Sequence, residues 1–278
     1  MQKKRRKGLA IALCLVILFC VVLAGLENST AKVKAEGVWR PDYDKVSIEE
    51  VLEKAELTDA DYELLYEQTG LTKLGVDGLK DRGLTGLILQ IQSNYFAPVE
   101  IEYTTILPYV LVGKREDFAP LCWLEDGDII ISQSTTVAGV KVGHSALVVD
   151  GENARVLEST QIGTDSGFVD AGVETLMSSY MVLRPTKIPE NIRRDAVDFA
   201  KENLVGIPYN QLVGLIPRKF TKKIKSTQCA HLCWYAYKKF GYDLDSNGGL
   251  FVAPKDIANS SYLEVVQIYG FDPENLWK

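Results

Sequence analysis

Histidine and cysteine are the scarcest residues in this chain of 278 residues that could carry out chemistry. There are only two histidines, His144 and His231, and five cysteines. A reaction that needs an imidazole or a thiol therefore has very few candidate residues. Basic residues are also in the minority, because 31 Lys and Arg stand against 37 Asp and Glu and give a net charge of −6. No basic block follows the first residues, so the sequence argues against a nucleic-acid partner.

The only long apolar run lies at the amino terminus. Residues 3–7 are all basic, and residues 8–26 carry no charge. This order is typical of an export signal, and residues 33–35 offer small side chains at the −3 and −1 positions for cleavage. The run also reaches the lower limit for crossing a bilayer, about 18 residues, so an uncleaved anchor is the alternative. Either way, we predict that residues 36–278 lie outside the cytoplasm, secreted or membrane-anchored.

The exported part is strongly acidic and poor in thiols. Residues 1–35 hold seven Lys and Arg and one Glu, which leaves 24 basic and 36 acidic residues and a net charge of −12. Only Cys122, Cys229 and Cys233 remain in it. An odd number of cysteines in a domain of this size does not indicate a disulfide framework. At least one thiol should be free.

Residues 36–97 read as a helical amino-terminal portion. Ser47 to Glu50 has the pattern of a capping box, which predicts a helix start. Thr58 is a plausible N-cap of the next helix, and Gly70 is a natural stop for it. Apolar spacing continues the helical pattern up to about residue 96.

Residues 98–278 form the predicted main domain, in which β-rich runs come before a pair of helices. Helices are expected from Ile192 to Leu204 and from Cys229 to Phe240. Strands are expected at residues 103–112, 128–132, 145–150, 154–160, 180–183 and 262–269. Strands followed by helices predict an α+β fold with a mainly antiparallel sheet packed on the Cys-bearing helix, rather than a doubly wound parallel sheet.

The first candidate for chemistry is a predicted hairpin that carries His144. A turn centred on Gly151 would place His144 directly across from Glu158, and Val148 across from Ala154. Opposite Cβ atoms are about 4.5–5.5 Å apart, so the carboxylate could hold the imidazole in one tautomer. A four-residue turn would shift the pairing by one residue. The alternative is a His and a Glu that only cap neighbouring strands.

Cys229 is the candidate nucleophile. Ser226 to Gln228 introduces a helix whose first turn contains this thiol, where free N–H groups and the helix dipole favour a thiolate. Cys229 also lies on the apolar face of the helix, so it should point at the sheet. Cys233, one turn later, reads as a small buried hydrophobe. A thiol, an imidazole and a carboxylate would together supply nucleophile, base and orienting group.

Several short motifs point to one family. They are Gly127–Ile130, Gly143–Val149, Gly206–Asn210, Cys229–Cys233 and Gln68–Leu71. In these motifs the chain resembles the permuted branch of the NlpC-type papain-like cysteine amidases and peptidases, in particular the YiiX/YaeF-like group. The order of His before Cys is the permuted one. The resemblance extends over roughly residues 58–270.

The resemblance implies a circularly permuted papain-like fold and an exported cysteine hydrolase that cleaves an amide through an acyl-enzyme, with cell-wall peptide as the first substrate. It assigns Cys229 as nucleophile, His144 as general base, Glu158 as the orienting residue and Tyr209 as a substrate or oxyanion-side contact. Ala230 stands where such enzymes commonly have Ser. That departure leaves the backbone N–H of Cys229 available to an oxyanion. No cofactor is implied.

Two other functions stay open. Relatives of lecithin retinol acyltransferase share the permuted order, so acyl transfer or hydrolysis of a lipid or thioester is one alternative. A non-catalytic binding module that keeps the pocket is the other, although the complete Cys, His and Glu set counts against it. The expected partners are a peptide or amide-containing substrate, including cell wall or lipid, and a membrane through residues 8–26 if these are not cleaved.

Two metal-like patterns lead to no predicted metal site. Cys229, His231 and Cys233 resemble zinc ligands, but positions 229 and 231 point to different sides of a helix and no second ligand pair exists. His231 is instead expected either at the surface or behind the site, where it would contact residues of the site but not the substrate. Residues 243–248 begin like a calcium loop, but Pro254 stands where a bidentate Glu is needed. A turn is expected there.

Overall fold

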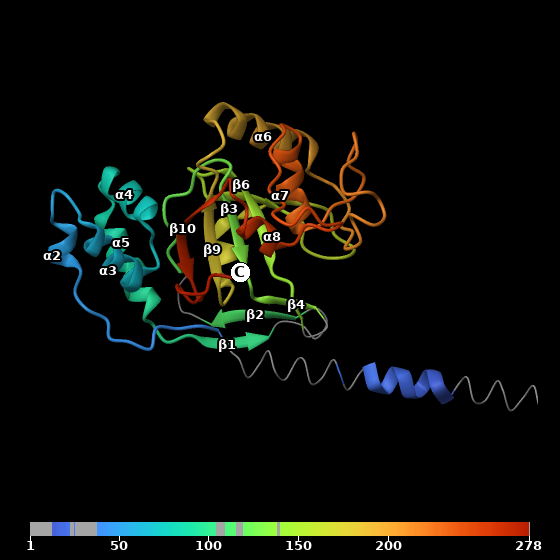
Figure 1. Ribbon diagram of the computed structural model, residues 1–278, viewed down its shortest axis with the longest axis horizontal. Coiled ribbons are helices and arrows are strands. Elements are labelled where there is room, and N and C mark those ends of the chain that lie inside the picture. The colour runs from blue at the N-terminus through green and yellow to red at the C-terminus, as the bar shows by residue number, and fades with distance from the viewer. Residues whose placement is uncertain are drawn as a thin grey trace, which may run out of the picture.

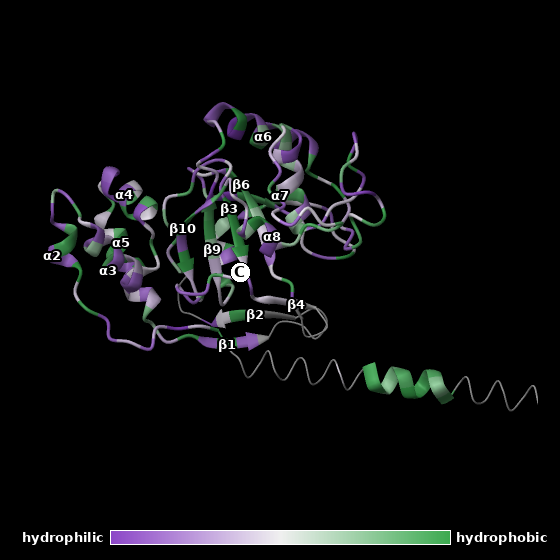
Figure 2. Cartoon of the chain, viewed as in Figure 1, coloured by the Kyte–Doolittle hydropathy of each residue, from purple (hydrophilic) through white to green (hydrophobic). Residues whose placement is uncertain are grey.

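The structure is a computed structural model that describes residues 13–22, 25, 38–103, 109–114, 119–137 and 140–277 (Figure 1). Residues 13–22 form an apolar helix that lies apart from the rest (Figure 2). None of the helices in these described ranges combines the length and apolar character needed to cross a membrane. The predicted cleavage site at residues 33–35 and the basic residues 3–7 lie outside the described residues.

A six-stranded antiparallel sheet organises the carboxy-terminal part of the chain. Its strand order is β10-β9-β3-β6-β7-β8. The neighbouring strands are all antiparallel, which confirms the predicted α+β class with a mainly antiparallel sheet. The strands are β3 (Ile129–Ser132), β6 (His144–Asp150), β7 (Arg155–Glu158), β8 (Gly167–Asp170), β9 (Tyr180–Arg184) and β10 (Glu264–Tyr269).

Both faces of this sheet are covered by helices. Odd-numbered residues of the central strands, such as Ile129 and Leu147, pack with α6 (Glu190–Asn203) and α7 (Cys229–Lys238). Even-numbered residues, such as Ile130, pack with the amino-terminal helices on the other face. Because successive side chains of a strand point to opposite faces and both faces are covered, β3 and β6 are buried along nearly their whole length. Each fully buried Ile or Leu contributes about 1.5–3 kcal/mol to stability.

The amino-terminal portion is helical, as the sequence predicts. Thr58 caps α3, because its hydroxyl accepts from the Asp61 N–H and the Asp61 carboxylate accepts from the Thr58 N–H. Gly70 ends α3 with a φ of 71°, and a Cβ there would clash with the Ile268 carbonyl of β10. The helices are α2 (Glu49–Leu52), α3 (Asp59–Thr69), α4 (Lys73–Asp81) and α5 (Thr85–Tyr95).

The capping box predicted at Ser47 is wrong. Ile48 occupies the N-cap position of α2, and no side chain caps that helix. The Ser47 hydroxyl accepts only from the Glu49 N–H at 3.4 Å, because the helix begins one residue later than the pattern requires.

A second, four-stranded sheet has the order β1-β2-β4-β5. The predicted strand at residues 103–112 is in fact two antiparallel strands, because the β-rich composition does not mark where the chain reverses. Short elements escaped prediction, among them η1 (Ala171–Leu176), a 3-10 helix, and α8 (Pro254–Ala258). The strands of this sheet are β1 (Glu100–Tyr103), β2 (Tyr109–Lys114), β4 (Thr135–Val137) and β5 (Val140–Lys141).

Candidate active site

Cys229 is the first residue of α7 and is 8% exposed. Gln228 caps this helix, because its side-chain oxygen accepts from the Ala230 N–H at 2.8 Å. Burial raises the pKa of the Cys229 thiol, but the hydrogen bond with His144 and the N–H groups of Ser145 and Ala230 lower it more. The net result is a thiol pKa below its ordinary value, so the thiolate is favoured.

His144 is the first residue of β6 and lies against Glu158. Its Nε2 is 2.7 Å from the Glu158 Oε2 atom. Burial lowers the pKa of the imidazole, but Glu174, Cys229 and Glu158 outweigh it and raise the pKa well above 6.5. A raised imidazole pKa beside a lowered thiol pKa favours an imidazolium–thiolate pair.

The predicted register of this hairpin is wrong by two residues. Val148 pairs with Val156, not with Ala154. The turn is longer than predicted, and a bulge interrupts the pairing after Val148. A shift of two residues keeps each side chain on its face of the sheet, because strands repeat every two residues. His144 and Glu158 are therefore diagonal neighbours rather than opposite ones, and their side chains still meet.

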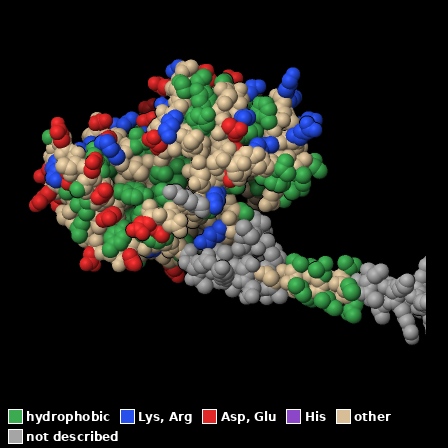
Figure 3. Space-filling model, viewed as in Figure 1, with side chains coloured by type: hydrophobic (Ala, Val, Ile, Leu, Met, Phe, Trp, Pro, Cys, Tyr) green, Lys and Arg blue, Asp and Glu red, His purple; other side chains and the backbone are tan. Residues whose placement is uncertain are grey.

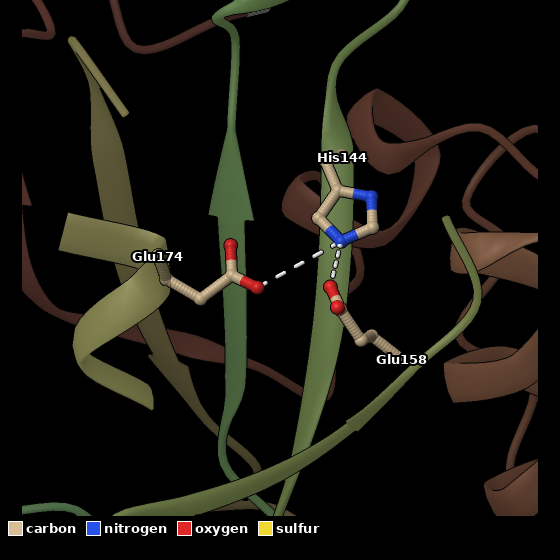
Figure 4. A group of neighbouring side chains, drawn as sticks. All are labelled: His144, Glu158 and Glu174. Atoms are coloured by element: carbon tan, nitrogen blue, oxygen red, sulfur yellow. Dashed lines mark hydrogen bonds and ion pairs between the residues drawn. The ribbon is translucent and has the colours of Figure 1, made fainter. Parts of the chain in front are cut away.

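Glu174 is a third member of the site that the sequence analysis did not find. It lies in η1, only 1% exposed, with its Oε1 3.7 Å from the His144 Nε2 (Figure 4). Burial raises the pKa of its carboxyl and the charge of Glu158 raises it further, whereas His144 lowers it. An acidic residue within the apolar stretch 171–176 is the one signal that could have identified it.

His144 contacts residues from both sides of the sheet. Cys229 belongs to the core on the α7 side, whereas η1 begins with Ala171, which packs in the core on the other side. Because His144 is the first residue of β6, at the edge of both cores, its ring can reach the thiol with one nitrogen and the carboxylates with the other. The imidazole therefore lies between the thiol on one side and the two carboxyl groups on the other.

A cavity of about 610 Å³ opens onto the thiol and the imidazole. Cys229, His144 and Tyr209 all line it. The Tyr209 segment runs beside the start of α7, where the Asn210 N–H donates to the Thr227 carbonyl at 2.7 Å. Burial, with the nearby Cys229 charge, raises the pKa of the Tyr209 phenol to about 12. This hydroxyl keeps its proton at neutral pH and can donate a hydrogen bond into the cavity.

His231 and Cys233 do not join this group. His231 is buried, so of its two predicted places, at the surface or behind the site, the surface one is wrong; the loop before α7 covers that side of the helix. Its ring nitrogens lie 2.9 Å from the Thr227 hydroxyl and 2.7 Å from the Lys219 carbonyl. Burial lowers the pKa of His231 to about 4. Burial also raises the pKa of the Cys233 thiol far above its usual range, as expected for an inert buried cysteine.

Comparison with known proteins gives partial similarities. No family model matches the chain. An 86-residue stretch, 31% of the chain, is 33% identical to the uncharacterized protein YycO of Bacillus subtilis (strain 168) and spans 34% of that protein's length. The crystal structure of the metalloprotein yiiX from Escherichia coli O157:H7 (DUF1105) covers 52% of this chain and 97% of its own, at 13% identity and a TM-score of 0.40. The chain is thus similar to parts of a YycO protein and, distantly, to a YiiX protein.

Proposed function

We propose that this protein is an exported cysteine hydrolase of circularly permuted papain-like fold, which cleaves an amide bond with Cys229, His144 and Glu158. One observation carries the proposal: Cys229 at a helix start and His144 line the same cavity, and a carboxylate orients that imidazole at 2.7 Å. A nucleophile, a base and an orienting group brought together in this way are the requirements of covalent catalysis. Their opening into a cavity gives a substrate access to the thiol.

In the proposed reaction, the Cys229 thiolate attacks the carbonyl carbon of the amide. The His144 imidazolium gives its proton to the leaving amine, and the carbonyl carbon stays bonded to sulfur as an acyl-enzyme. The neutral imidazole then takes a proton from a water molecule as this water attacks the acyl carbon. The carboxylic acid leaves, and the thiolate and imidazolium are restored. Glu158 accepts the Nε2 hydrogen throughout and stabilises the ring's positive charge.

Two groups are suited to stabilise the negative oxygen of the tetrahedral intermediate. The N–H groups in the first turn of α7 have no partner within the helix and lie at its positive end. Cys229 itself supplies one of them. The Tyr209 hydroxyl, protonated at neutral pH, lines the same cavity. Fixed donors of this kind are commonly worth about 2.7–4 kcal/mol each in acyl-transfer enzymes.

Cell-wall peptide is the proposed substrate, and an extracytoplasmic location is proposed with it. Both follow from the basic and apolar residues 3–26, which are typical of an export signal or anchor. Whether secreted or anchored by residues 8–26, the domain would meet envelope peptides before any cytoplasmic substrate.

Lipid or thioester hydrolysis, or acyl transfer, is the second candidate, and the surface beside the cavity favours it. Phe251 lines the cavity and is 42% exposed, and the neighbouring Leu250 is 63% exposed. Leu212 and Ile216, in the loop that carries Tyr209, are also exposed. Figure 3 shows hydrophobic side chains gathered on the right-hand side of the folded part, where Figure 1 draws the loops next to α7. An exposed apolar surface next to a thiol would suit an acyl chain.

A direct test compares the two substrate classes. Purified full-length protein is incubated with cell-wall peptides or with phospholipid vesicles, and released amines or fatty acids are measured for the wild type, Cys229→Ala and Cys233→Ala. Amine release that Cys229→Ala abolishes and Cys233→Ala retains supports the amidase. Fatty-acid release with the same dependence would instead establish the second candidate. The absence of any release that depends on Cys229 contradicts both and favours a binding module.

A further inference from the structure

Glu174 is a buried carboxyl group that raises the pKa of His144 but takes no part in the proton transfers of the proposed reaction. Within the described residues, neither of its oxygens accepts a hydrogen bond, although the residue is only 1% exposed; its one hydrogen-bonding interaction is a proton shared with the Glu158 carboxyl, which helps to raise its pKa. Its side chain points at the imidazole of His144 (Figure 4). Buried carboxyl groups are normally hydrogen-bonded, and one whose oxygens accept no hydrogen bond needs an explanation.

The oxygens of Glu174 complete a set of three ligand atoms. His144, Glu158 and Glu174 each offer one such atom, and the three atoms lie within 4.8 Å of one another. A tetrahedral zinc ion with bonds of about 2.0–2.2 Å places its ligands roughly 3.3–3.6 Å apart. The Nε2 to Glu174 Oε1 distance of 3.7 Å already fits, and the 2.7 Å contact with Glu158 must open by less than about 1 Å.

We propose that His144, Glu158 and Glu174 bind a divalent transition-metal ion such as Zn²⁺, and that the bound ion switches off the thiol hydrolase. One imidazole and two carboxylates supply three ligands of the types that bind zinc and leave a fourth position open. The mixed nitrogen and oxygen set favours zinc over calcium or magnesium, which prefer oxygen ligands alone. Burial raises the pKa of Glu174 to about 7, so metal binding releases to solvent any proton that this carboxyl holds. The two carboxylates then match the double positive charge.

Inhibition follows from the protons on the imidazole. Coordination uses the Nε2 lone pair, so the proton on Nε2 leaves to solvent and the remaining ring proton stays on Nδ1. Because Nε2 faces the carboxylates, Nδ1 is the nitrogen left for Cys229. A ring in that state has no free lone pair and cannot take the proton of the hydrolytic water. Metal binding rests on the geometry alone, whereas its inhibitory effect rests on the proposed function.

Binding is tested first, in a protein that lacks the competing thiol. Zn²⁺ is titrated into full-length Cys229→Ala protein by calorimetry, because a thiolate would itself capture zinc. We expect one equivalent to bind, and Glu174→Gln in the same background to weaken binding at least tenfold. Glu152→Gln, at an exposed position in the hairpin turn, is the matched control and should change nothing. Absence of binding in Cys229→Ala, or equal affinity in Glu174→Gln, overturns the site.

Thermal unfolding shows that the variants are folded and gives a second readout. Zn²⁺ should raise the melting temperature of Cys229→Ala and of its Glu152→Gln control, because a ligand that binds only the folded state stabilises it. It should leave the Glu174→Gln and Glu158→Gln proteins unchanged. An equal zinc-dependent shift in all four proteins places the ion elsewhere and contradicts the proposal.

Inhibition is tested separately, on proteins that retain Cys229. Zn²⁺ should inhibit wild-type hydrolysis, a chelator should reverse this, and the fold inhibition should drop at least tenfold in Glu174→Gln. Equal inhibition in Glu174→Gln means that the ion acts at Cys229 directly and contradicts the proposal. If zinc binds as expected but hydrolysis continues, the inhibitory step is wrong. If no variant hydrolyses anything without zinc, the proposed function fails, and the titration alone decides the metal site.

Discussion

Two buried groups of charged side chains lie at opposite ends of β3 and differ in how their charges are paired. At the start of the strand, both Asp128 oxygens accept from the Arg184 guanidinium, at 3.0 and 2.7 Å, and Glu125 is 3.1 Å from the same guanidinium. At the other end, where β3 pairs with His144, Glu158 contacts the ring at 2.7 Å and Glu174 only at 3.7 Å. The first group is saturated with hydrogen bonds, and the second is not.

This difference separates structure from chemistry. A saturated buried ion pair locks two strands and has no capacity left for a ligand. A group with a carboxyl that accepts no hydrogen bond and a thiol of lowered pKa keeps proton and ligand exchange possible, at the expense of stability. Substitutions in the Asp128–Arg184 group should therefore change stability, and substitutions in the His144 group should change activity.

The largest expected effect is on activity, at Cys229. Cys229→Ala should lower the proposed hydrolysis by about 10⁴-fold or more, because no other group forms the covalent bond. The free energy of unfolding should change by less than about 1 kcal/mol, since only one sulfur atom at the edge of a cavity is lost. Steady-state kinetics and urea unfolding measure the two values. A large loss of stability would mean that Cys229 is mainly a packing residue.

The next effect is on stability, at Arg184. Arg184→Met should lower the free energy of unfolding by about 3–5 kcal/mol, because it leaves Asp128 buried without its partner. The double variant Arg184→Met with Asp128→Asn should recover much of this loss. Urea unfolding of the three proteins gives the comparison. A loss below about 1 kcal/mol in the single variant would show that this ion pair contributes little.

The helix ends, on one hand, and the hairpin register and Glu174, on the other, differ in how far the sequence could predict them. Thr58 and Gly70 cap α3 and Cys229 begins α7 as predicted, because these helix ends are set by neighbouring residues, whereas the same kind of signal at Ser47 was wrong. The hairpin register could not be fixed, since it depends on a bulge and on the turn length. Glu174 could not be predicted either, because its place beside His144 depends on how η1 docks against the sheet.

A smaller effect is expected on the pH profile, from Glu158→Gln. The glutamine side chain keeps an oxygen that can accept from the His144 Nε2 hydrogen, but it has no negative charge. The pKa of His144 should therefore fall and that of Cys229 should rise. The acid limb of activity, where the thiolate forms, should move to higher pH. The alkaline limb, where the imidazolium is lost, should move to lower pH. Kinetics from pH 5 to 10 should show this narrowing, with about a tenfold lower maximum. An unchanged profile would exclude Glu158 as the orienting residue.

The smallest effect is expected at Cys233, one turn along the same helix. Cys233→Ala should change hydrolysis by less than about threefold and lower the free energy of unfolding by about 1 kcal/mol, because a small buried side chain is shortened. The same kinetic and urea measurements apply. A loss of activity comparable to that of Cys229→Ala would contradict the assignment of the nucleophile.

The pH dependence of Cys229 alkylation shows whether the thiol and the His144 imidazole act as a pair. Full-length wild-type and His144→Ala proteins are treated with iodoacetamide across the pH range, and modification of Cys229 is followed by peptide mass spectrometry. We expect wild-type Cys229 to react with a midpoint below the ordinary thiol pKa of about 8.5, and His144→Ala to move the midpoint to or above that value. An ordinary midpoint in the wild type, unchanged by His144→Ala, would show that the thiol and the imidazole are not a catalytic pair.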